Sequence, residues 1–244
     1  MPKTCLITGA NRGIGFEIAR LIAEKGHDVI IGARSLEDAS MAAKKLRDRG
    51  FSAEALAIDV TDGASVKRAA DELEGRVERL DVLVNNAGIM KESTRQPSKA
   101  TVEAFEAQLA TNVVGPMRTM QAFIPLLKRS NDARIVNMSS DLGAMAQASD
   151  PESRYAAVLA PTYRTSKAAL NMLSLAFAKE LKDDRITVSV CSPGWCRTDL
   201  DDEIDSDRAP FSAAEGADTA AWLAVEADAS QNGKFYARRS EIAW

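Results

Sequence analysis

Histidine and cysteine are scarce in this chain, and their scarcity excludes several kinds of site. The 244 residues include a single histidine, His27, and three cysteines. One histidine is too few for a histidine-based metal centre, and its place before an expected strand favours a surface position. We therefore expect no metal and no histidine triad. Three cysteines are an odd and sparse set, which suits free thiols in a reducing compartment.

Long apolar runs and an excess of basic charge are also missing. No run approaches the roughly 18 apolar residues of a membrane-spanning helix, and the first expected strand begins at residue 4, which leaves no room for a signal peptide. The formal net charge is -4, which argues against nucleic acid or an anionic membrane as the main partner. We therefore expect a cytoplasmic protein.

No break in composition divides the chain. Apolar residues make up 45% and charged residues 27%, which is ordinary for a globular protein, and no low-complexity segment interrupts the pattern. We expect residues 1–244 to form one domain.

The spacing of apolar residues predicts alternating strands and helices. The expected strands are 4–7, 28–33, 53–58, 82–84, 134–138, 186–191 and 234–237, and the expected helices are 14–26, 35–49, 62–79, 101–128 with a break at 115–116, 163–182 and 212–227. Residues 141–161 are expected to be irregular. Because the strands lack a polar face, this order predicts an α/β fold, a Rossmann-type doubly wound domain whose central parallel sheet has helices on both faces.

A glycine-rich turn follows the first strand and opens the first helix. It contains Gly9, Gly13 and Gly15. Glycines let the backbone approach a ligand, and a helix N-terminus attracts negative charge, so we expect a pyrophosphate here. On its own the turn is a weak signal, since glycines also punctuate ordinary loops and the spacing G-x-x-x-G-x-G differs from the dinucleotide fingerprint G-x-G-x-x-G.

Tyr163 and Lys167 stand four residues apart on one face of an expected helix. An ammonium beside a phenol favours the phenolate, so we expect the pKa of Tyr163 to fall from about 10 toward the range where it exchanges a proton at neutral pH. The same spacing occurs by chance on many solvated helices. Ser140 at the end of a strand and Asn112 in the interrupted helix strengthen the catalytic interpretation.

At this point the chain resembles the short-chain dehydrogenase/reductase family over nearly all of its length. The resemblance is carried by TGANRGIG at 8–15, Asp59-Val60, NNAG at 85–88, Asn112 in TNVVG, Ser140 closing VNMSS, YRTSK at 163–167 and PGWCRT at 193–198. Seven motifs in the right order make coincidence very improbable. Within the family, the terminus EIAW resembles that of the carbonyl reductases and their sniffer-type relatives.

The resemblance implies roles for particular residues. Tyr163 would give or take the proton, and Lys167 would adjust the pKa of Tyr163 and hold the nicotinamide ribose. Ser140 would bind the substrate oxygen, and Asn112 would support a water relay. Ser140 is preferred to Ser139 because the family's serine is followed by x-x-Gly, as here by Gly143. The implied cofactor-binding residues are Gly9, Asn11, Arg12, Gly13, Ile14, Gly15, Arg34, Asp59, Val60, Asn86, Ala87, Gly88, Tyr163, Lys167, Pro193, Gly194, Trp195 and Thr198.

The charges after the second strand favour NADP(H) over NAD(H). An NAD enzyme places an acidic residue on the ribose diol about 20 residues after the glycine turn, but that strand ends in Gly32-Ala33-Arg34-Ser35. Arg12 and Arg34 could both face a 2′-phosphate. We therefore expect NADP(H) as the cofactor.

The leading hypothesis is an enzyme, an NADPH-dependent carbonyl reductase with a small-molecule carbonyl or alcohol as substrate. The alternatives are an NADP-linked dehydrogenase of hydroxysteroids or other bulky alcohols, a 3-oxoacyl reductase, and a low-turnover nucleotide-binding signalling protein. The long interval between Ser140 and Tyr163 resembles an insertion that obstructs subunit packing in some carbonyl reductases, so a monomer and a homodimer both stay open. An acidic loop at 199–207 would disfavour anionic substrates if it borders the pocket.

Overall fold

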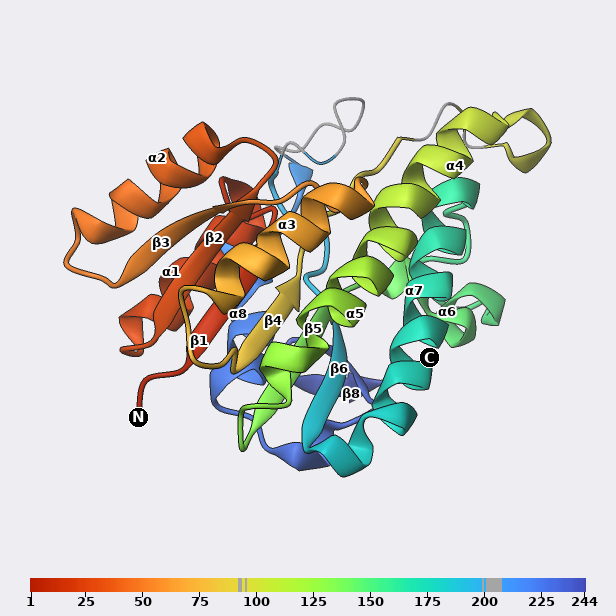
Figure 1. The fold of residues 1–244 in the computed structure, drawn as a ribbon. Helices are drawn as coiled ribbons and strands as arrows, with labels where there is room; N and C mark the ends of the chain where they lie inside the picture. The colour runs from red at the N-terminus through yellow and green to blue at the C-terminus, as the bar shows by residue number, and fades with distance from the viewer. Residues whose placement is uncertain (92–93, 95, 199, 201–207) are drawn as a thin grey trace.

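Residues 1–91, 94, 96–198, 200 and 208–244 are described by a computed structural model, and in them eight strands form one sheet (Figure 1). The strand order is β3-β2-β1-β4-β5-β6-β7-β8. The strands are β1 (Thr4–Thr8), β2 (Asp28–Ala33), β3 (Ala53–Ala57), β4 (Val82–Asn85), β5 (Ala133–Met138), β6 (Ile186–Ser192), β7 (Phe235–Ala237) and β8 (Ser240–Ile242). The order reverses between β1 and β4, where doubly wound sheets bind ligands beyond the carboxyl ends of their strands.

The expected fold class is confirmed, with one addition to the sheet. The first seven strands run parallel, but β8 pairs with β7 in the antiparallel sense. Arg238 and Arg239 make the tight reversal between them with positive φ angles of 48° and 59°. Two successive positive φ values are typical of a two-residue hairpin turn. Such turns are usually recognised in a sequence by glycine or asparagine, and not by arginine. The sequence therefore gave no sign of β8.

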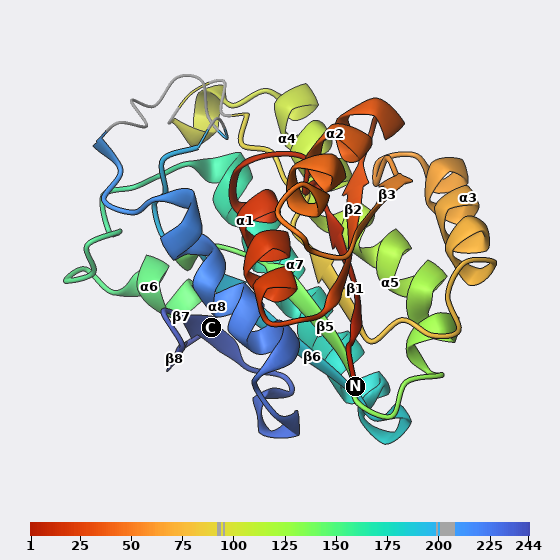
Figure 2. The ribbon, with the colours of Figure 1, turned by 90° about the vertical axis from the view of Figure 1, so that its left-hand side faces the viewer.

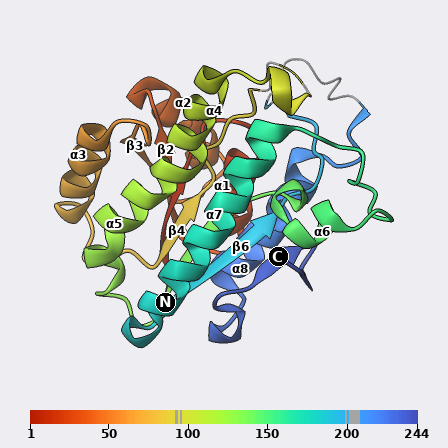
Figure 3. The same cartoon turned by 90° about the vertical axis from the view of Figure 1, so that its right-hand side faces the viewer.

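Helices cover both faces of the sheet. Figure 2 shows α1 (Gly13–Glu24), α2 (Leu36–Arg47) and α8 (Ala213–Val225) on one face, and Figure 3 shows α3 (Gly63–Glu74), α5 (Gly115–Leu127) and α7 (Pro161–Glu180) on the other. Successive side chains of β1 point to opposite faces of the sheet. Ile7 packs with α1 and α8, whereas Leu6 packs with α3 and α5. This burial on both faces explains the uniformly apolar strands.

The remaining elements are short. They are η1 (Pro97–Lys99), α4 (Val102–Leu109), η2 (Ala110–Val114), η3 (Asp141–Gly143), α6 (Met145–Ser149), η4 (Lys182–Asp184) and η6 (Ala229–Gln231). None of the described helices combines the length and the apolar character needed to cross a membrane.

The break in the long helix has a different form from the one expected. The bend was expected at Gly115–Pro116, but the structure has a π-helical turn, η2, just before it. The backbone N–H of Gly115 reaches back five residues to the carbonyl oxygen of Ala110. A π turn contains one extra residue, and such turns are common at functional sites. Asn112, a candidate catalytic residue, lies in the middle of this turn.

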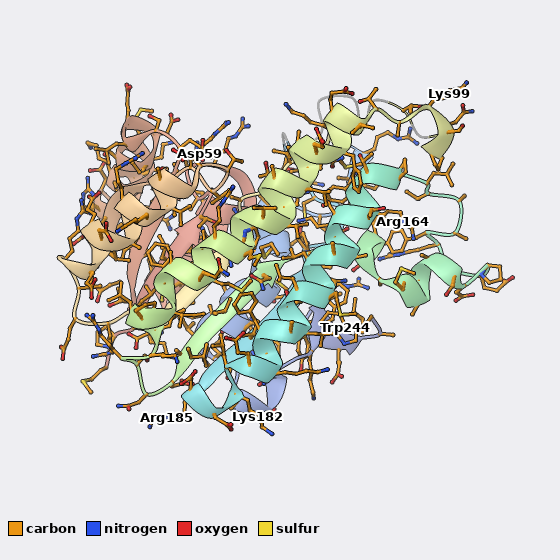
Figure 4. All side chains as sticks on the ribbon, turned by 45° about the vertical axis from the view of Figure 1, so that its right-hand side comes forward. Asp59, Lys99, Arg164, Lys182, Arg185 and Trp244 are labelled. Atoms are coloured by element: carbon orange, nitrogen blue, oxygen red, sulfur yellow. The ribbon has the colours of Figure 1, made fainter. Side chains whose placement is uncertain are left out.

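Residues 141–161 were expected to be irregular, and this was partly wrong. They contain η3 and α6, which are too short to produce a readable apolar periodicity. The segment is anchored at two labelled places in Figure 4. The carbonyl oxygen of Trp244 accepts from the N–H of Ala146 at 2.8 Å, and the Arg164 guanidinium donates to the carbonyl oxygen of Leu142 at 3.1 Å.

Candidate active site

The glycine turn between β1 and α1 adopts a backbone that other residues rarely can. Gly9 and Gly13 have φ angles of 63° and 58°, in the left-handed region. A Cβ on Gly9 would lie 2.9 Å from the Cα of Ala87, so the turn packs directly against the segment after β4. Arg12 caps α1, whose first turn holds no acidic side chain. The backbone N–H groups at this helix start are therefore disposed to receive an anion.

The NNAG segment holds this turn in place. The Asn86 side-chain amide donates to the carbonyl oxygens of Thr8 and Gly9, at 2.9 and 3.0 Å. The Thr8 hydroxyl in turn accepts from the N–H groups of Asn86 and Ala87, both at 3.1 Å. Asn86 thus acts as a brace between the ends of β1 and β4.

A groove of about 770 Å³ runs along the carboxyl ends of the strands, and this size suits a large organic ligand. Figure 4 places Asp59 at this end of the sheet and Lys182 and Arg185 at the opposite end. The expected cofactor residues that line the groove are Gly9, Asn11, Arg12, Gly13, Ile14, Gly15, Arg34, Asp59, Val60, Asn86, Ala87, Gly88, Tyr163, Lys167, Pro193 and Thr198. The glycine turn and α1 supply six of these residues, and the others come from the segments that follow other strands and from α7.

Two expected cofactor residues lie elsewhere. Gly194 packs on Phe211, where an added Cβ would lie 3.1 Å from the ring, and Trp195 is 48% exposed; neither lines the groove. The sequence analysis also missed lining residues, among them Asp38, Ile89 and Thr111. Thr111 opens the quoted motif TNVVG, so its place beside Asn112 could have indicated it, whereas Asp38 and Ile89 belong to no quoted motif. Of the acidic loop, all but Leu200 lies outside the described residues, and Leu200 lines the groove.

The end of the groove near β2 carries charges of both signs. Arg34 is exposed and forms no ion pair among the described residues. Hydrogen bonds from Thr61 and the nearby charge of Arg34 lower the pKa of Asp59. Asp38, in the first turn of α2, also borders this end. The sequence indicated the arginine but not the second carboxylate.

Ser140 and Tyr163 are brought together from β5 and α7. The Ser140 hydroxyl is hydrogen-bonded to the phenol of Tyr163, and Tyr163 is only 6% exposed. Ser140 directly follows Ser139, whose side chain turns into α7 and donates to Asn171 Oδ1 at 2.6 Å. The choice of Ser140 over Ser139 as the partner of the tyrosine is thus supported by the geometry. A hydroxyl and a phenol at one point can bind and protonate a carbonyl oxygen.

Lys167 lies beside this pair, but its effect on the tyrosine was predicted wrongly. The Lys167 ammonium lies 5.6 Å from the centre of the Tyr163 ring and donates to the carbonyl oxygen of Met138 at 2.8 Å. Burial raises the pKa of Tyr163 to about 12, although the Ser140 hydrogen bond acts in the opposite direction. Burial also lowers the pKa of Lys167 to about 8. Desolvation, which the sequence does not reveal, is the largest cause of the shift in the Tyr163 pKa.

Asn112 is fully buried and joins three segments of the site. Its Oδ1 accepts from the N–H of Ile89 at 2.9 Å, and its Nδ2 donates to the carbonyl oxygen of Ile89 and to Ser166 Oγ, at 2.9 and 3.0 Å. A Cβ on Gly88 would meet Asn112 Oδ1 at 3.4 Å and Lys167 Nζ at 3.6 Å. The asparagine and the lysine therefore approach the same glycine after β4.

The described parts of the chain contain no group of three or more His, Cys, Asp and Glu side chains placed to hold a metal ion. The three cysteines are free and buried. The candidate catalytic side chains Ser140, Tyr163, Lys167 and Asn112 carry hydroxyl, phenol, ammonium and amide groups.

The family model for short chain dehydrogenases matches residues 3–209. This chain belongs to the short-chain dehydrogenase family. A curated relative, the short-chain dehydrogenase anuI of Penicillium roqueforti, is 40% identical over 201 residues, which cover 80% of this chain and 79% of that protein. The 3-oxoacyl-[acyl-carrier-protein] reductase of Bos taurus is 32% identical and covers 85% of this chain and 81% of its own. As a short-chain dehydrogenase, the chain is an oxidoreductase.

Among solved structures, the NADPH-bound carbonyl reductase from chicken fatty liver has the same fold. It superposes with a TM-score of 0.86 at 27% identity, and the alignment covers 100% of this chain and 99% of that one. The expected likeness to the carbonyl reductases is confirmed.

Proposed function

We propose that this short-chain dehydrogenase is an NADPH-dependent carbonyl reductase that converts a ketone or aldehyde to an alcohol. The observation that carries the proposal is the hydrogen bond between Ser140 and Tyr163, of which the buried Tyr163 lines a groove that also contains the glycine turn. The pair supplies an oxygen-binding hydroxyl and a proton donor at one point. The groove supplies a place for a dinucleotide beside them.

The residues of the groove fit NADP(H). The left-handed glycines and the α1 N-terminus form a cradle for the pyrophosphate, because a Cβ at Gly9 or Gly15 would collide with the neighbouring backbone. The Arg34 guanidinium, which has no ion pair among the described residues, suits a 2′-phosphate. NADPH, when bound in this groove, supplies the hydride that the carbonyl carbon gains.

The chain's own residues handle the oxygen and the proton. Ser140 holds the carbonyl oxygen by a hydrogen bond, and Tyr163 gives its phenolic proton to that oxygen as the carbon gains a hydride. With that hydride and the Tyr163 proton, the C=O group becomes a CH–OH group, and Tyr163 is left as a phenolate. Lys167 stabilises that negative charge. Asn112 bonds the Ile89 backbone and Ser166. Through these bonds it supports the route by which solvent returns a proton to Tyr163.

The structural likeness to a carbonyl reductase that is described as NADPH-bound supports this activity. The 3-oxoacyl reductase relative from Bos taurus supports a second candidate, reduction of a 3-oxoacyl thioester by the same residues. The two activities differ in the substrate's tail and not in its reacting carbonyl. An NADP-linked dehydrogenase of a bulky alcohol would use the same groups in reverse.

The decisive experiment is turnover with both cofactors. Purified protein is given NADPH or NADH with a panel of ketones, aldehydes and a 3-oxoacyl thioester, and cofactor absorbance is followed. We expect carbonyl reduction with NADPH, at least 100-fold slower in Tyr163→Phe because the proton donor is lost, with cofactor affinity retained. Exclusive turnover of the thioester would select the second candidate, and oxidation of alcohols alone would select the dehydrogenase.

NADPH binding without turnover of any substrate would favour the nucleotide-binding signalling protein. Light scattering on the same sample would distinguish a monomer from a homodimer.

A further inference from the structure

One side chain on α7 bonds the chain on both sides of Ser140. Asn171 is 5% exposed and lies on α7, about two turns after Tyr163. Its Oδ1 accepts from the Ser139 hydroxyl at 2.6 Å, and its Nδ2 donates to the carbonyl oxygen of Gly143 at 3.1 Å. One amide can make both bonds because it is an acceptor and a donor at once. Both ends of this short segment are therefore tied to the helix that carries the phenol.

The backbone of the same segment encloses Ser140. The N–H of Ser139 donates to the carbonyl oxygen of Cys191 at 2.7 Å, which continues the pairing of β5 with β6. The N–H of Gly143 donates to the carbonyl oxygen of Ser140 at 2.8 Å, and the Ser140 hydroxyl accepts from the N–H of Leu142 at 3.2 Å. Ser140 thus lies in a hydrogen-bonded turn, and the bonds of Asn171 fix where this turn lies relative to α7.

The other partner of Ser140 belongs to the same helix. Tyr163 on α7 is hydrogen-bonded to the Ser140 hydroxyl. For carbonyl reduction the serine and the phenol must reach one oxygen atom together, and a displacement of about 1 Å in such a pair costs about 100-fold in rate. The Ser139 hydroxyl also approaches the carbonyl oxygen of Lys167, but at 3.4 Å, so Asn171 provides its shorter contact.

We propose that Asn171 is a positioning residue that sets the separation between the Ser140 hydroxyl and the Tyr163 phenol. Asn171 does not line the groove, and it acts through Ser140. The effect on turnover rests on the proposed function, but the ordering of the turn around Ser140 does not.

The first test separates catalysis from cofactor binding. Asn171→Leu removes both hydrogen bonds and keeps a side chain of similar size, and Asn171→Ser leaves room for water, in case the first variant does not fold. Because Arg164 still donates to the carbonyl oxygen of Leu142, we expect the turn to loosen and not to detach. In both variants kcat/KM for carbonyl reduction should fall about 10- to 100-fold, while the Kd for NADPH stays as in the wild type. Wild-type kcat/KM in either folded variant would overturn the proposal.

The matched control is Ser174→Ala, which removes a buried hydrogen bond of the same helix away from Ser140. Ser174 Oγ accepts from Asn137 Nδ2 at 2.8 Å and so joins α7 to β5. The control should lose stability in urea unfolding, as the Asn171 variants do, yet keep its kcat/KM. An equal loss of kcat/KM in Ser174→Ala would overturn the proposal, because activity would then follow the stability of α7.

A double-mutant cycle asks whether Asn171 acts through the serine. In a Ser140→Ala background, Asn171→Leu should lower kcat/KM by no more than about twofold, because the hydroxyl that it positions is already gone. A loss as large as in the wild-type background would overturn the proposal, since Asn171 would then act independently of Ser140.

Hydrogen exchange tests the ordering of the turn without any turnover. In cofactor-free protein, amides of the peptide 139–144 should exchange about 10-fold faster in Asn171→Leu than in the wild type, and at the wild-type rate in Ser174→Ala. Unchanged exchange in Asn171→Leu would overturn the structural part of the proposal. Absence of carbonyl reduction in the wild type would count against the proposed function, while the exchange rates still decide whether Asn171 orders this turn.

Discussion

The side-chain amide of Asn86 donates to the carbonyl oxygen of Gly9 at 3.0 Å. The two residues lie 77 positions apart in the sequence, and the bond joins the loops after β1 and β4. Gly15 packs against this bond, since a Cβ there would lie 2.3 Å from Asn86 Nδ2 and 2.5 Å from Gly9 O. The shape of the glycine turn thus depends on a contact that neither loop makes alone.

Gly15→Ala should therefore damage both folding and cofactor binding. The added methyl group must displace backbone as well as the amide, which we expect to cost about 1–3 kcal/mol of stability. Urea unfolding and NADPH titration would measure the two effects. Gly63→Ala is the matched control, because its Cβ would meet only Arg118 Nε at 3.7 Å. Wild-type stability and NADPH affinity in Gly15→Ala would show that the turn adapts.

Arg34→Ala should reduce NADPH affinity and spare NADH. A charge-assisted contact to the 2′-phosphate contributes roughly 1.5–3 kcal/mol, so we expect NADPH to bind about 10- to 100-fold more weakly. Asp38→Asn should act in the opposite direction, because it removes a negative charge from the same end of the groove. Dissociation constants for both cofactors would check this. Equal losses for NADH and NADPH in Arg34→Ala would place the guanidinium away from the phosphate.

Gly143→Ala should lower kcat while leaving cofactor binding intact. An added Cβ would lie 2.7 Å from Lys167 Cβ and 2.8 Å from Lys167 C, so η3 would have to move away from α7 and carry Ser140 with it. Small misplacements of this kind cost about 100-fold in rate. Steady-state kinetics beside an NADPH titration would separate the two effects. A variant with normal kcat would show that η3 shifts without moving the serine.

Lys167 should make stability depend on pH. Burial lowers its pKa to about 8 from the ordinary value of 10.5, so the unfolded chain binds the proton more tightly than the folded one. Stability attributable to this residue therefore rises with pH through the interval between those values. Between about pH 7 and about pH 10, we expect the wild type to gain about 2 kcal/mol relative to Lys167→Met. A constant difference between the two unfolding curves would contradict this.

The fold could be predicted from the sequence because apolar strands alternate with helices, and each strand is followed by glycine or polar residues. Successive residues such as Leu6-Ile7 and Leu83-Val84 are buried on opposite faces of the sheet, so these strands do not alternate apolar and polar residues. Strands of this kind are typical of a parallel sheet covered on both faces. The same pattern led to the predicted site residues. Tyr163, Lys167 and Asn112 were expected on helices whose place in the alternation was clear. In the structure Tyr163 and Lys167 line the groove, and Asn112 lies buried beside Gly88.

What the sequence could not supply depends on burial and on contacts between distant segments. The direction of the Tyr163 pKa shift follows from desolvation, which spacing along a helix does not report. The carboxylate of Asp141 has its partners in the segment before α7, where Tyr155 had no assigned function. β8 depends on two arginines with positive φ, a conformation that their side chains do not favour.

The π turn at Ala110–Val114 also rotates the side chains of α5 relative to those of α4 around the helix axis. One additional residue in a helix with 3.6 residues per turn rotates everything beyond it by about 100° around the axis. α5 directs Met120 and Phe123 into the core against the sheet, whereas α4 directs Gln108 to the hydroxyl of Thr162 on α7. Without the extra residue, a straight α-helix would not direct Gln108 toward α7 and Phe123 toward the sheet at the same time. Deleting one residue of the turn other than Asn112 would therefore rotate α4 away from α7, although Gln108 and Asn112, which bond α7, would both still be present.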